Sequence, residues 1–171
     1  VRREAEASLK RLGVDVIDLY QIHWPNPDPD IEEGWTEIAK LVEEGKVRYA
    51  GVSNFSVSQI KCAQAIHPVA SFQPPYHMLE RNVEKELLAY CAANGIGVVA
   101  YSPMGSGLLT GKYTAEKIAA LPEDDWRRRS GRFKEPELSA NLALLEKLRP
   151  IAERNGRSLG PLAVAWVLRR P

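Results

Sequence analysis

The chain has 171 residues, of which 44% are hydrophobic and 26% are charged. This composition indicates a folded globular protein and excludes an intrinsically disordered one. Its 23 basic and 22 acidic side chains give a formal net charge of +1, which argues against nucleic acid or a membrane surface as a partner. The longest apolar stretch near either end, Leu162 to Leu168, falls far short of the roughly 20 residues that cross a bilayer. Because no signal-peptide pattern follows Val1, we expect a cytoplasmic protein.

The first half of the chain alternates between patterns typical of helices and of strands. Gly13 and Gly45 are predicted to end helices, and Ser56 is predicted to cap the start of one. The stretch from Val14 to Gln21 is mainly apolar and rich in β-branched residues, which predicts a strand buried on both faces. Three prolines between Trp24 and Asp30 exclude a helix or a strand there. In chain order, these patterns predict a helix over 2–12, a strand over 14–21, a loop over 24–30, a helix over 31–44, a strand over 46–52 and a helix over 56–66.

The second half continues this alternation and ends in helices. Asn82 and Ser139 are predicted to cap helices, and Pro161 lies in the first turn of the last one. In chain order, we predict a strand over 69–73, a helix over 82–93, a strand over 96–101, a Gly-rich loop over 105–112, an exposed arginine-rich excursion over 121–138 and two final helices. Strands separated by helices indicate right-handed βαβ units, so we predict an α/β fold with about four parallel strands in one domain over residues 1–171.

Polar side chains are predicted where each strand ends. Ligands bind at the carboxyl ends of parallel strands, so these residues are candidates for a common site. A polar residue at any single strand end is commonly a turn or cap residue, and this alternative stays open for each of them. The candidates are His23, Ser53, Asn54, Gln73, Tyr101 and Ser102.

The chemistry of these residues indicates the kind of ligand. The amides of Asn54 and Gln73 would complement a carboxamide, and the Tyr101 ring offers a face for stacking. His23 can donate a hydrogen bond to a carbonyl oxygen, and Trp24 can form an apolar wall beside it. A nicotinamide next to a reducible carbonyl compound would satisfy all of these groups.

The segment from Met104 to Lys112 is rich in glycine and could hold phosphate groups with backbone amides and a lysine. Its spacing fits neither the nucleotide-hydrolase P-loop nor GxGxxG, and a merely flexible loop is the alternative. The histidines are not spaced as metal ligands, so we expect no metal site. Cys62 and Cys91 are expected to be reduced, buried residues of helices.

Four segments of the chain resemble, in order, the signature motifs of the aldo-keto reductase family. They are SLKRLGVDVIDLYQIHWP at 8–25, GKVRYAGVSNF at 45–55, FQPPY at 72–76 and YSPMGSGLLTGK at 101–112. The resemblance covers essentially the whole chain. It implies a partial (β/α)8 TIM barrel from an oxidoreductase that uses NAD(P)H, with NADP(H) favoured over NAD(H), to reduce a small aldehyde or ketone to an alcohol.

The resemblance also implies a role for each matched residue. His23 matches the active-site histidine, and Tyr101 matches the ring that stacks on the nicotinamide. The carboxamide-holding residues correspond to Ser53, Asn54 and Gln73. The loop over the pyrophosphate corresponds to Ser102, Pro103, Met104, Gly105 and Lys112.

The family's catalytic tetrad consists of Asp, Tyr, Lys and His, and only its histidine has a match here. We therefore expect a truncated domain whose activity on its own is lost. The alternative is a non-catalytic half-barrel that binds cofactor weakly or acts as a self-associating assembly unit. In either case the truncated sheet would have open edges at 14–21 and 96–101 and an exposed inner face near Val16, Val52 and Val98. Because unpaired strand edges and exposed apolar surface favour association, we predict a homo-oligomer.

A final expectation concerns the arginines of the excursion after the Gly-rich loop. Arg127, Arg128, Arg129 and Arg132 could neutralise cofactor phosphates. The alternative is a solvated run of charges.

Overall fold

The computed structural model describes residues 1–27 and 30–169. The chain divides into two compact units, one formed by Val1–Pro75 with Arg81–Tyr101 and the other by Tyr76–Glu80 with Ser102–Pro171. The prediction of a single domain over 1–171 stays a prediction. The predicted loop over 24–30 is described except for residues 28 and 29, which lie outside the described residues.

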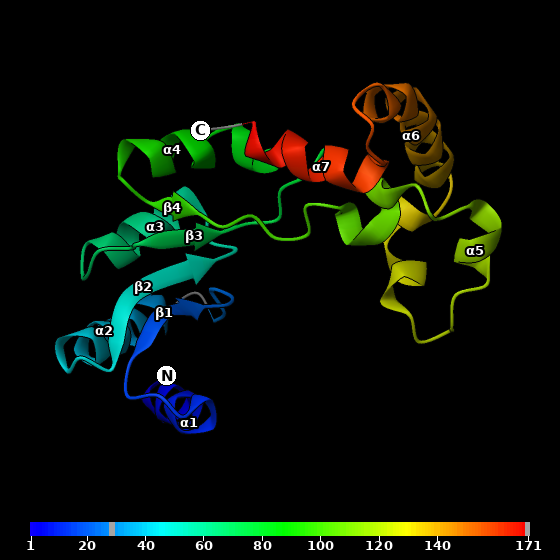
Figure 1. The fold of residues 1–171 in the computed structure, drawn as a ribbon. Coiled ribbons are helices and arrows are strands. Elements are labelled where there is room, and N and C mark those ends of the chain that lie inside the picture. The colour runs from blue at the N-terminus through cyan, green and yellow to red at the C-terminus, as the bar shows by residue number, and fades with distance from the viewer. Residues whose placement is uncertain (28–29, 170–171) are drawn as a thin grey trace. The chain divides into compact units, whose positions relative to one another are not determined.

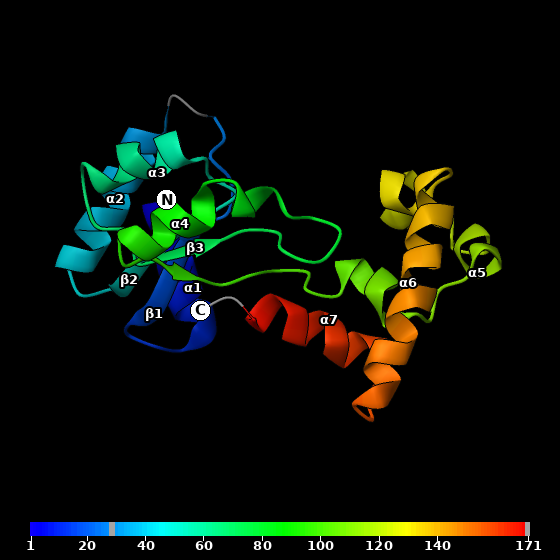
Figure 2. The ribbon, with the colours of Figure 1, turned by 90° about the horizontal axis from the view of Figure 1, so that it is seen from above.

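The first unit contains a four-stranded parallel sheet in the order β1-β2-β3-β4, which confirms the predicted alternation (Figure 1). Figures 1 and 2 show α2 and α3 along the same side of the strands. The elements in chain order are α1 Arg2–Leu12, β1 Ile17–Ile22, α2 Ile31–Glu43, β2 Val47–Ser53, α3 Val57–Gln64, β3 Ser71–Gln73, α4 Leu87–Ala93 and β4 Gly97–Val98.

Local sequence signals explain where these helices begin and end. Gly13 follows α1 in a left-handed conformation, and its N–H donates to the Leu9 carbonyl. Ser56 and Gln59 form a reciprocal capping box at the start of α3. On α2, the apolar stripe that includes Trp35, Ile38 and Leu41 is buried, so this helix supplies much of the layer against the sheet.

The prediction that the first strand is buried on both faces is wrong. β1 begins only at Ile17, and Leu19 and its register partner Tyr49 are 38% and 57% exposed. β1 is an edge strand of the sheet, and none of the described residues of this unit covers the exposed side chains of Leu19 and Tyr49. An apolar run cannot reveal such a one-sided environment, because hydrophobicity alone does not say what lies opposite.

The predicted inner face around Val52 is also wrong. Val52 is in register with Ile22 and Phe72, and Ile22 points toward Gly34 of α2. This row of side chains therefore faces the helices, and Val52 is fully buried. Because side chains alternate along a strand, the opposite face carries the row Gln21, Gly51, Ser71 and Gly97. That row is small and polar rather than apolar.

Two predicted caps are wrong for local reasons. Asn82 lies inside a short 3-10 turn, and α4 begins only after Glu86, whose backbone leaves the helical region at φ −148°. Ser139 lies inside α6, and the side chain of Glu135 accepts hydrogen bonds from its N–H and its hydroxyl. A carboxylate before the helix thus performs the capping that we predicted for the serine.

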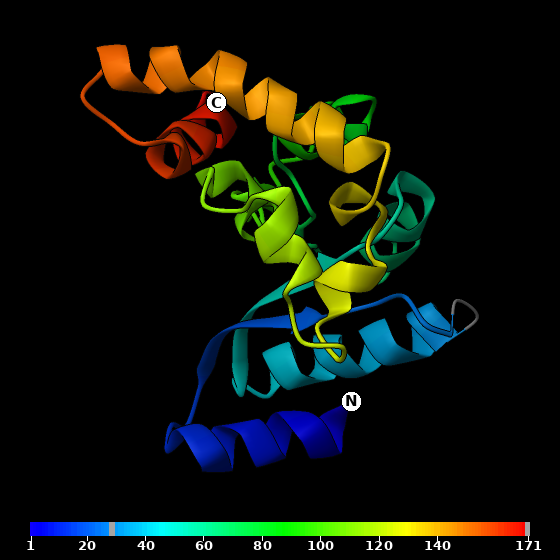
Figure 3. The same ribbon diagram turned by 90° about the vertical axis from the view of Figure 1, so that its right-hand side faces the viewer.

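The second unit is helical and has two apolar clusters. Its α-helices are α5 Ala115–Ala119, α6 Glu137–Arg154 and α7 Leu159–Leu168, and Figure 3 shows α6 and α7 next to each other. Leu109 packs with Leu145 and Leu159 in one cluster, and Leu108 packs with Phe133 in the other. Because Phe133 is only 4% exposed, the segment 121–138 is anchored to the unit rather than wholly exposed as predicted.

Among the residues that the structure describes, no helix combines the length and the apolar character needed to cross a membrane.

Candidate functional site

Asn54 joins the ends of three strands in the first unit. Its backbone has φ +63°, an uncommon left-handed conformation that asparagine adopts more readily than most residues. Its Nδ2 donates to the His23 carbonyl and to Ser53 Oγ, both at 3.0 Å. Its Oδ1 accepts a hydrogen bond from the Tyr101 hydroxyl at 3.0 Å. One side chain therefore ties together the segments that follow β1, β2 and β4.

Ser53 is buried beneath this junction. Its side chain donates to the Gln73 carbonyl at 2.7 Å, and the residue is 2% exposed. Ser53 thus holds the end of β2 against the end of β3. In the structure it supports the neighbouring groups rather than presenting its hydroxyl to solvent.

Gln73 takes part in a network of side chains on the polar face of the sheet. Its Nε2 donates to Gln21 Oε1 at 3.2 Å, and Gln21 Nε2 donates to Ser71 Oγ at 3.0 Å. Gln21 and Ser71 lie on β1 and β3, and both are in register with Gly51 of β2. The sequence analysis missed Gln21, Gly51 and Ser71. Polarity alone does not single out Gln21, because Asp18 is also a polar residue of β1.

The two aromatic candidates beside β1 are exposed. His23 and Trp24 follow the strand, with ring centroids 5.7 Å apart at an interplanar angle of 40°. Trp24 is 55% exposed. The structure therefore brings His23, Trp24, Asn54, Gln73 and Tyr101 to one end of the sheet, as the strand-end argument predicts, and their functional roles stay predictions.

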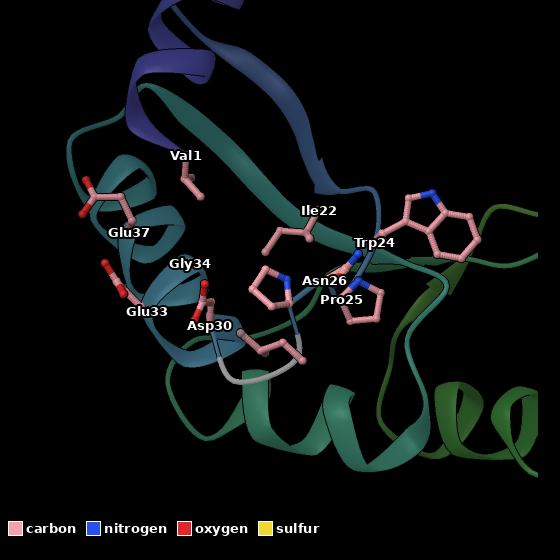
Figure 4. A pocket seen from close by; sticks show the side chains of 11 residues that line it. Val1, Ile22, Trp24, Pro25, Asn26, Asp30, Glu33, Gly34 and Glu37 are labelled. Atoms are coloured by element: carbon pink, nitrogen blue, oxygen red, sulfur yellow. The ribbon is translucent and has the colours of Figure 1, made fainter.

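A cavity of about 370 Å³ lies next to this end of β1. Figure 4 shows that the start of α1, the end of β1 and α2 form it, with Val1, Ile22 and Glu37 around it, while the Trp24 ring points away. It therefore lies on the helix side of the sheet rather than on the face that carries Gln73.

In the second unit, the Gly-rich segment forms short 3-10 turns over Gly105–Thr110, with a kink at Ser106 and Gly107. Ser102, Gly105, Ser106 and Gly107 all have positive φ angles. The N–H groups of Gly105 and Gly107 donate to the Ser102 and Met104 carbonyls within the segment. Leu108 and Leu109 anchor the turn in the two apolar clusters. Pro103 is partly exposed, Met104 is 40% exposed, and the Lys112 side chain reaches solvent. The role of this segment in binding phosphate stays a prediction.

His77 lies beneath this turn, and the sequence analysis assigned it no role. The residue is 1% exposed, and its Nδ1 accepts a hydrogen bond from the Leu79 N–H at 3.2 Å. A Cβ atom placed on Gly105 would lie 3.6 Å from the edge of the ring. A neutral imidazole thus packs under the start of the Gly-rich turn.

His77 should make the stability of the chain depend on pH. Burial, together with the nearby Arg132 charge, lowers the pKa of His77 to about 4, and the Glu80 charge opposes this shift. Because the folded pKa is below the unfolded value near 6.5, the neutral ring stabilises the fold above that pH, and this stabilisation is lost as the pH falls toward 4. We expect a loss of about 2 kcal/mol after allowance for solvent screening, measured by urea unfolding at pH 7 and pH 4.5.

The matched control for this prediction is His77→Asn. The asparagine oxygen can still accept the hydrogen bond from Leu79 but cannot titrate. The variant should lose most of the extra destabilisation at pH 4.5. An unchanged difference between the two pH values would show that other groups cause it.

Two of the arginines in the second unit form ion pairs with carboxylates. Arg127 pairs with Asp125 and also contacts the Tyr113 hydroxyl, whereas Arg132 pairs with Glu80. The Asp125 pKa falls to about 2, mainly because Arg127 donates to it. Their charges therefore already have partners. Over the described ranges, no group of three or more His, Cys, Asp or Glu side chains could hold a metal ion.

The cysteine prediction is confirmed in part. Cys91 of α4 is buried, and burial raises its thiol pKa to about 11. Cys62 of α3 is only partly buried. Its Sγ lies 3.5 Å from Glu32 Oε1.

Comparison with known sequences identifies the class of protein. The profile of the Aldo/keto reductase family matches residues 1–171, and the chain belongs to this family. Its members are oxidoreductases that use nicotinamide cofactors. The parallel strands and alternating helices are accordingly part of a (β/α)8 barrel.

Individual relatives agree with this assignment. The chain is 41% identical over 169 residues to "Aldo-keto reductase YhdN" of Bacillus subtilis (strain 168), covering 98% of this chain and 50% of the relative. It is 40% identical to the solved glycerol dehydrogenase AKR11B4 from Gluconobacter oxydans, with a TM-score of 0.91 over 98% of this chain and 51% of the other. A thermostable aldo-keto reductase, Tm1743, solved with the inhibitor epalrestat, is 42% identical with a TM-score of 0.60 over 68% of this chain and 44% of the other. The chain spans about half the length of these relatives.

Proposed function

We propose that this chain provides the nicotinamide-binding part of an aldo-keto reductase that reduces aldehydes or ketones to alcohols with NAD(P)H. The observation that carries the proposal is the Asn54 junction, which brings hydrogen-bonding groups from three strand ends together. Family membership makes a nicotinamide cofactor the expected ligand for such groups.

The remaining hydrogen-bonding capacity of these side chains fits a carboxamide. Asn54 uses both Nδ2 hydrogens within the chain. Among the described residues, its Oδ1 accepts a hydrogen bond only from the Tyr101 hydroxyl and can accept a second one. None of the hydrogen bonds among the described residues uses Gln73 Oε1, and Gln73 Nε2 has a second hydrogen to donate. The oxygens of Asn54 and Gln73 can therefore accept hydrogen bonds from the NH₂ group of a carboxamide, and Gln73 Nε2 can donate one to its oxygen.

The other candidates supply what the reduction of a carbonyl needs. When bound, the cofactor supplies the hydride. The exposed His23 can donate a hydrogen bond to the carbonyl oxygen of the substrate and so stabilise the charge that develops there. Trp24 provides an apolar surface beside it, and Tyr101 provides a ring for stacking.

We further propose that the turn from Ser102 to Gly105, with Lys112, holds the pyrophosphate, and that NADP(H) is favoured over NAD(H). The positive φ angles at Ser102 and Gly105 and the exposed lysine support the first part. The preference for NADP(H) rests on the family resemblance alone.

A second candidate function is a non-catalytic unit that self-associates. The open β1 edge and the exposed pair Leu19 and Tyr49 favour it, because unpaired strand edges and uncovered apolar surface promote association. The polar row on the same face works against association driven by apolar burial alone. In either case we propose a homo-oligomer that forms through the open edges.

One experiment separates these functions. The 171-residue chain is titrated with NADPH and NADH by fluorescence, assayed with NADPH and 4-nitrobenzaldehyde, and sized by light scattering. Because only His23 of the family's tetrad has a match, we expect saturable binding, tighter for NADPH, and no turnover. A folded chain that binds neither cofactor and forms a defined oligomer would contradict the first proposal and support the second.

A further inference from the structure

We infer that Gln21 is a positioning residue that fixes the orientation of the Gln73 side chain. The inference deepens the proposed function, since it rests on Gln73 receiving the carboxamide of the nicotinamide. It begins from the two hydrogen bonds that link Ser71, Gln21 and Gln73 across the polar face of the sheet.

The two side chains come from strands that are not neighbours. Gln21 is on β1 and Gln73 is on β3, with β2 between them. Their amides meet because Gly51, at the crossing point on β2, has no side chain. A Cβ atom on Gly51 would lie 2.2 Å from Ser71 Oγ and 3.1 Å from Gln21 Cγ, so any larger residue would occupy the space in which the network forms.

The network couples the orientation of the Gln73 amide to that of Gln21. With Nε2 donating to Gln21 Oε1, Oε1 is left as an acceptor. If the Gln73 amide rotated by half a turn, its oxygen would face the oxygen of Gln21, and two acceptors cannot share a hydrogen bond. The amide of Gln73 can therefore reverse only together with that of Gln21.

An isolated glutamine on a half-exposed surface samples several rotamers, and a ligand must then select one of them. Gln73 is only partly buried, so packing does not immobilise it fully. The hydrogen bond that Gln73 donates to Gln21 therefore reduces the freedom that binding would otherwise remove. This is pre-organisation of a binding group by a residue that does not touch the ligand.

Two substitutions of Gln21 separate positioning from packing. Gln21→Met keeps the length of the side chain and removes its hydrogen bonds. Gln21→Glu keeps an oxygen that accepts a hydrogen bond from Gln73 Nε2, and its other oxygen can accept one from the Ser71 hydroxyl. Because a carboxylate has no donor, this variant permits only the observed orientation of the Gln73 amide. We expect NADPH affinity to fall about tenfold in the methionine variant and to stay within about threefold in the glutamate variant.

A second readout does not depend on the cofactor. The side-chain amide of Gln73 gives its own ¹H–¹⁵N NMR signals, and its hydrogen exchange should be slow in the wild type and in Gln21→Glu. It should be faster in Gln21→Met. Ser71→Ala breaks the network from its other end by removing the acceptor of Gln21 Nε2. It should accelerate the exchange of the Gln73 amide less than Gln21→Met does. This variant keeps the test possible if Gln21→Met fails to fold.

The outcomes are distinct. Unchanged Gln73 exchange in both Gln21→Met and Ser71→Ala would overturn the inference, whatever the affinities. Faster exchange in Gln21→Met, with NADPH affinity unchanged in that variant and in Gln73→Ala, would support the positioning of Gln73 and contradict its proposed role in binding. Faster exchange with weaker binding, both restored in Gln21→Glu, would support both.

Discussion

Replacing Asn54 by alanine should destabilise the chain by about 3 kcal/mol, because three hydrogen bonds of roughly 1 kcal/mol each are lost. The substitution removes the donors to His23 and Ser53 and the acceptor for Tyr101. NADPH affinity should fall at least about tenfold, since the ends of β1, β2 and β4 are no longer tied together. Urea unfolding followed by tryptophan fluorescence and a fluorescence titration with NADPH measure the two effects.

Asn54→Gly is the matched control, because the backbone at this position has φ +63°. Alanine pays a steric cost in this left-handed region and glycine does not, so the glycine variant should be about 1 kcal/mol more stable than the alanine variant. Both lack the bridging amide, and both should bind NADPH weakly. A glycine variant with the stability and the affinity of the wild type would show that the side chain contributes nothing.

Gly51→Ala should be about equally damaging, at about 3 kcal/mol, although it adds only one methyl group. The new Cβ would lie 2.2 Å from Ser71 Oγ and 3.0 Å from the Ser71 carbonyl oxygen. The hydroxyl can rotate away, but the carbonyl belongs to the β-ladder and cannot move without disturbing it. Gln73 should also lose its partner Gln21, so NADPH affinity should fall together with stability.

Gly97→Ala supplies the comparison within the same row of the sheet. A Cβ atom there would lie 3.5 Å from the Ala70 carbonyl oxygen, an ordinary contact, and the glycine is exposed. Its unfolding free energy should stay within about 0.5 kcal/mol of the wild type. If the two alanine variants were equally stable, the crowding at Gly51 would not be real.

The sequence was informative where a local rule determines the structure. Helix stops such as Gly13 and the capping box at Ser56 follow from backbone and side-chain chemistry within a few residues. The alternation of strands and helices was sufficient to predict a parallel sheet. The strand ends then followed, because parallel strands expose all their carboxyl ends on one edge.

The sequence failed where the outcome depends on residues distant in the chain. The burial of β1 depends on what covers each face, and the direction of Val52 depends on the register between β1 and β2. The network from Gln21 to Gln73 depends on the open space over Gly51, which only the three-dimensional register creates. His77 was missed because its partners, Leu79 and the turn at Gly105, give no sequence pattern.

The central claim is that the strand-end side chains hold the nicotinamide, and one measurement tests it directly. The ¹⁵N-labelled chain is titrated with NADPH and, separately, with 2′,5′-ADP, which carries the adenosine and phosphate groups without the nicotinamide. We predict that NADPH shifts the side-chain amide signals of Asn54 and Gln73 saturably and that 2′,5′-ADP leaves both signals unchanged. Saturable NADPH binding that leaves both side-chain signals in place would contradict the claim.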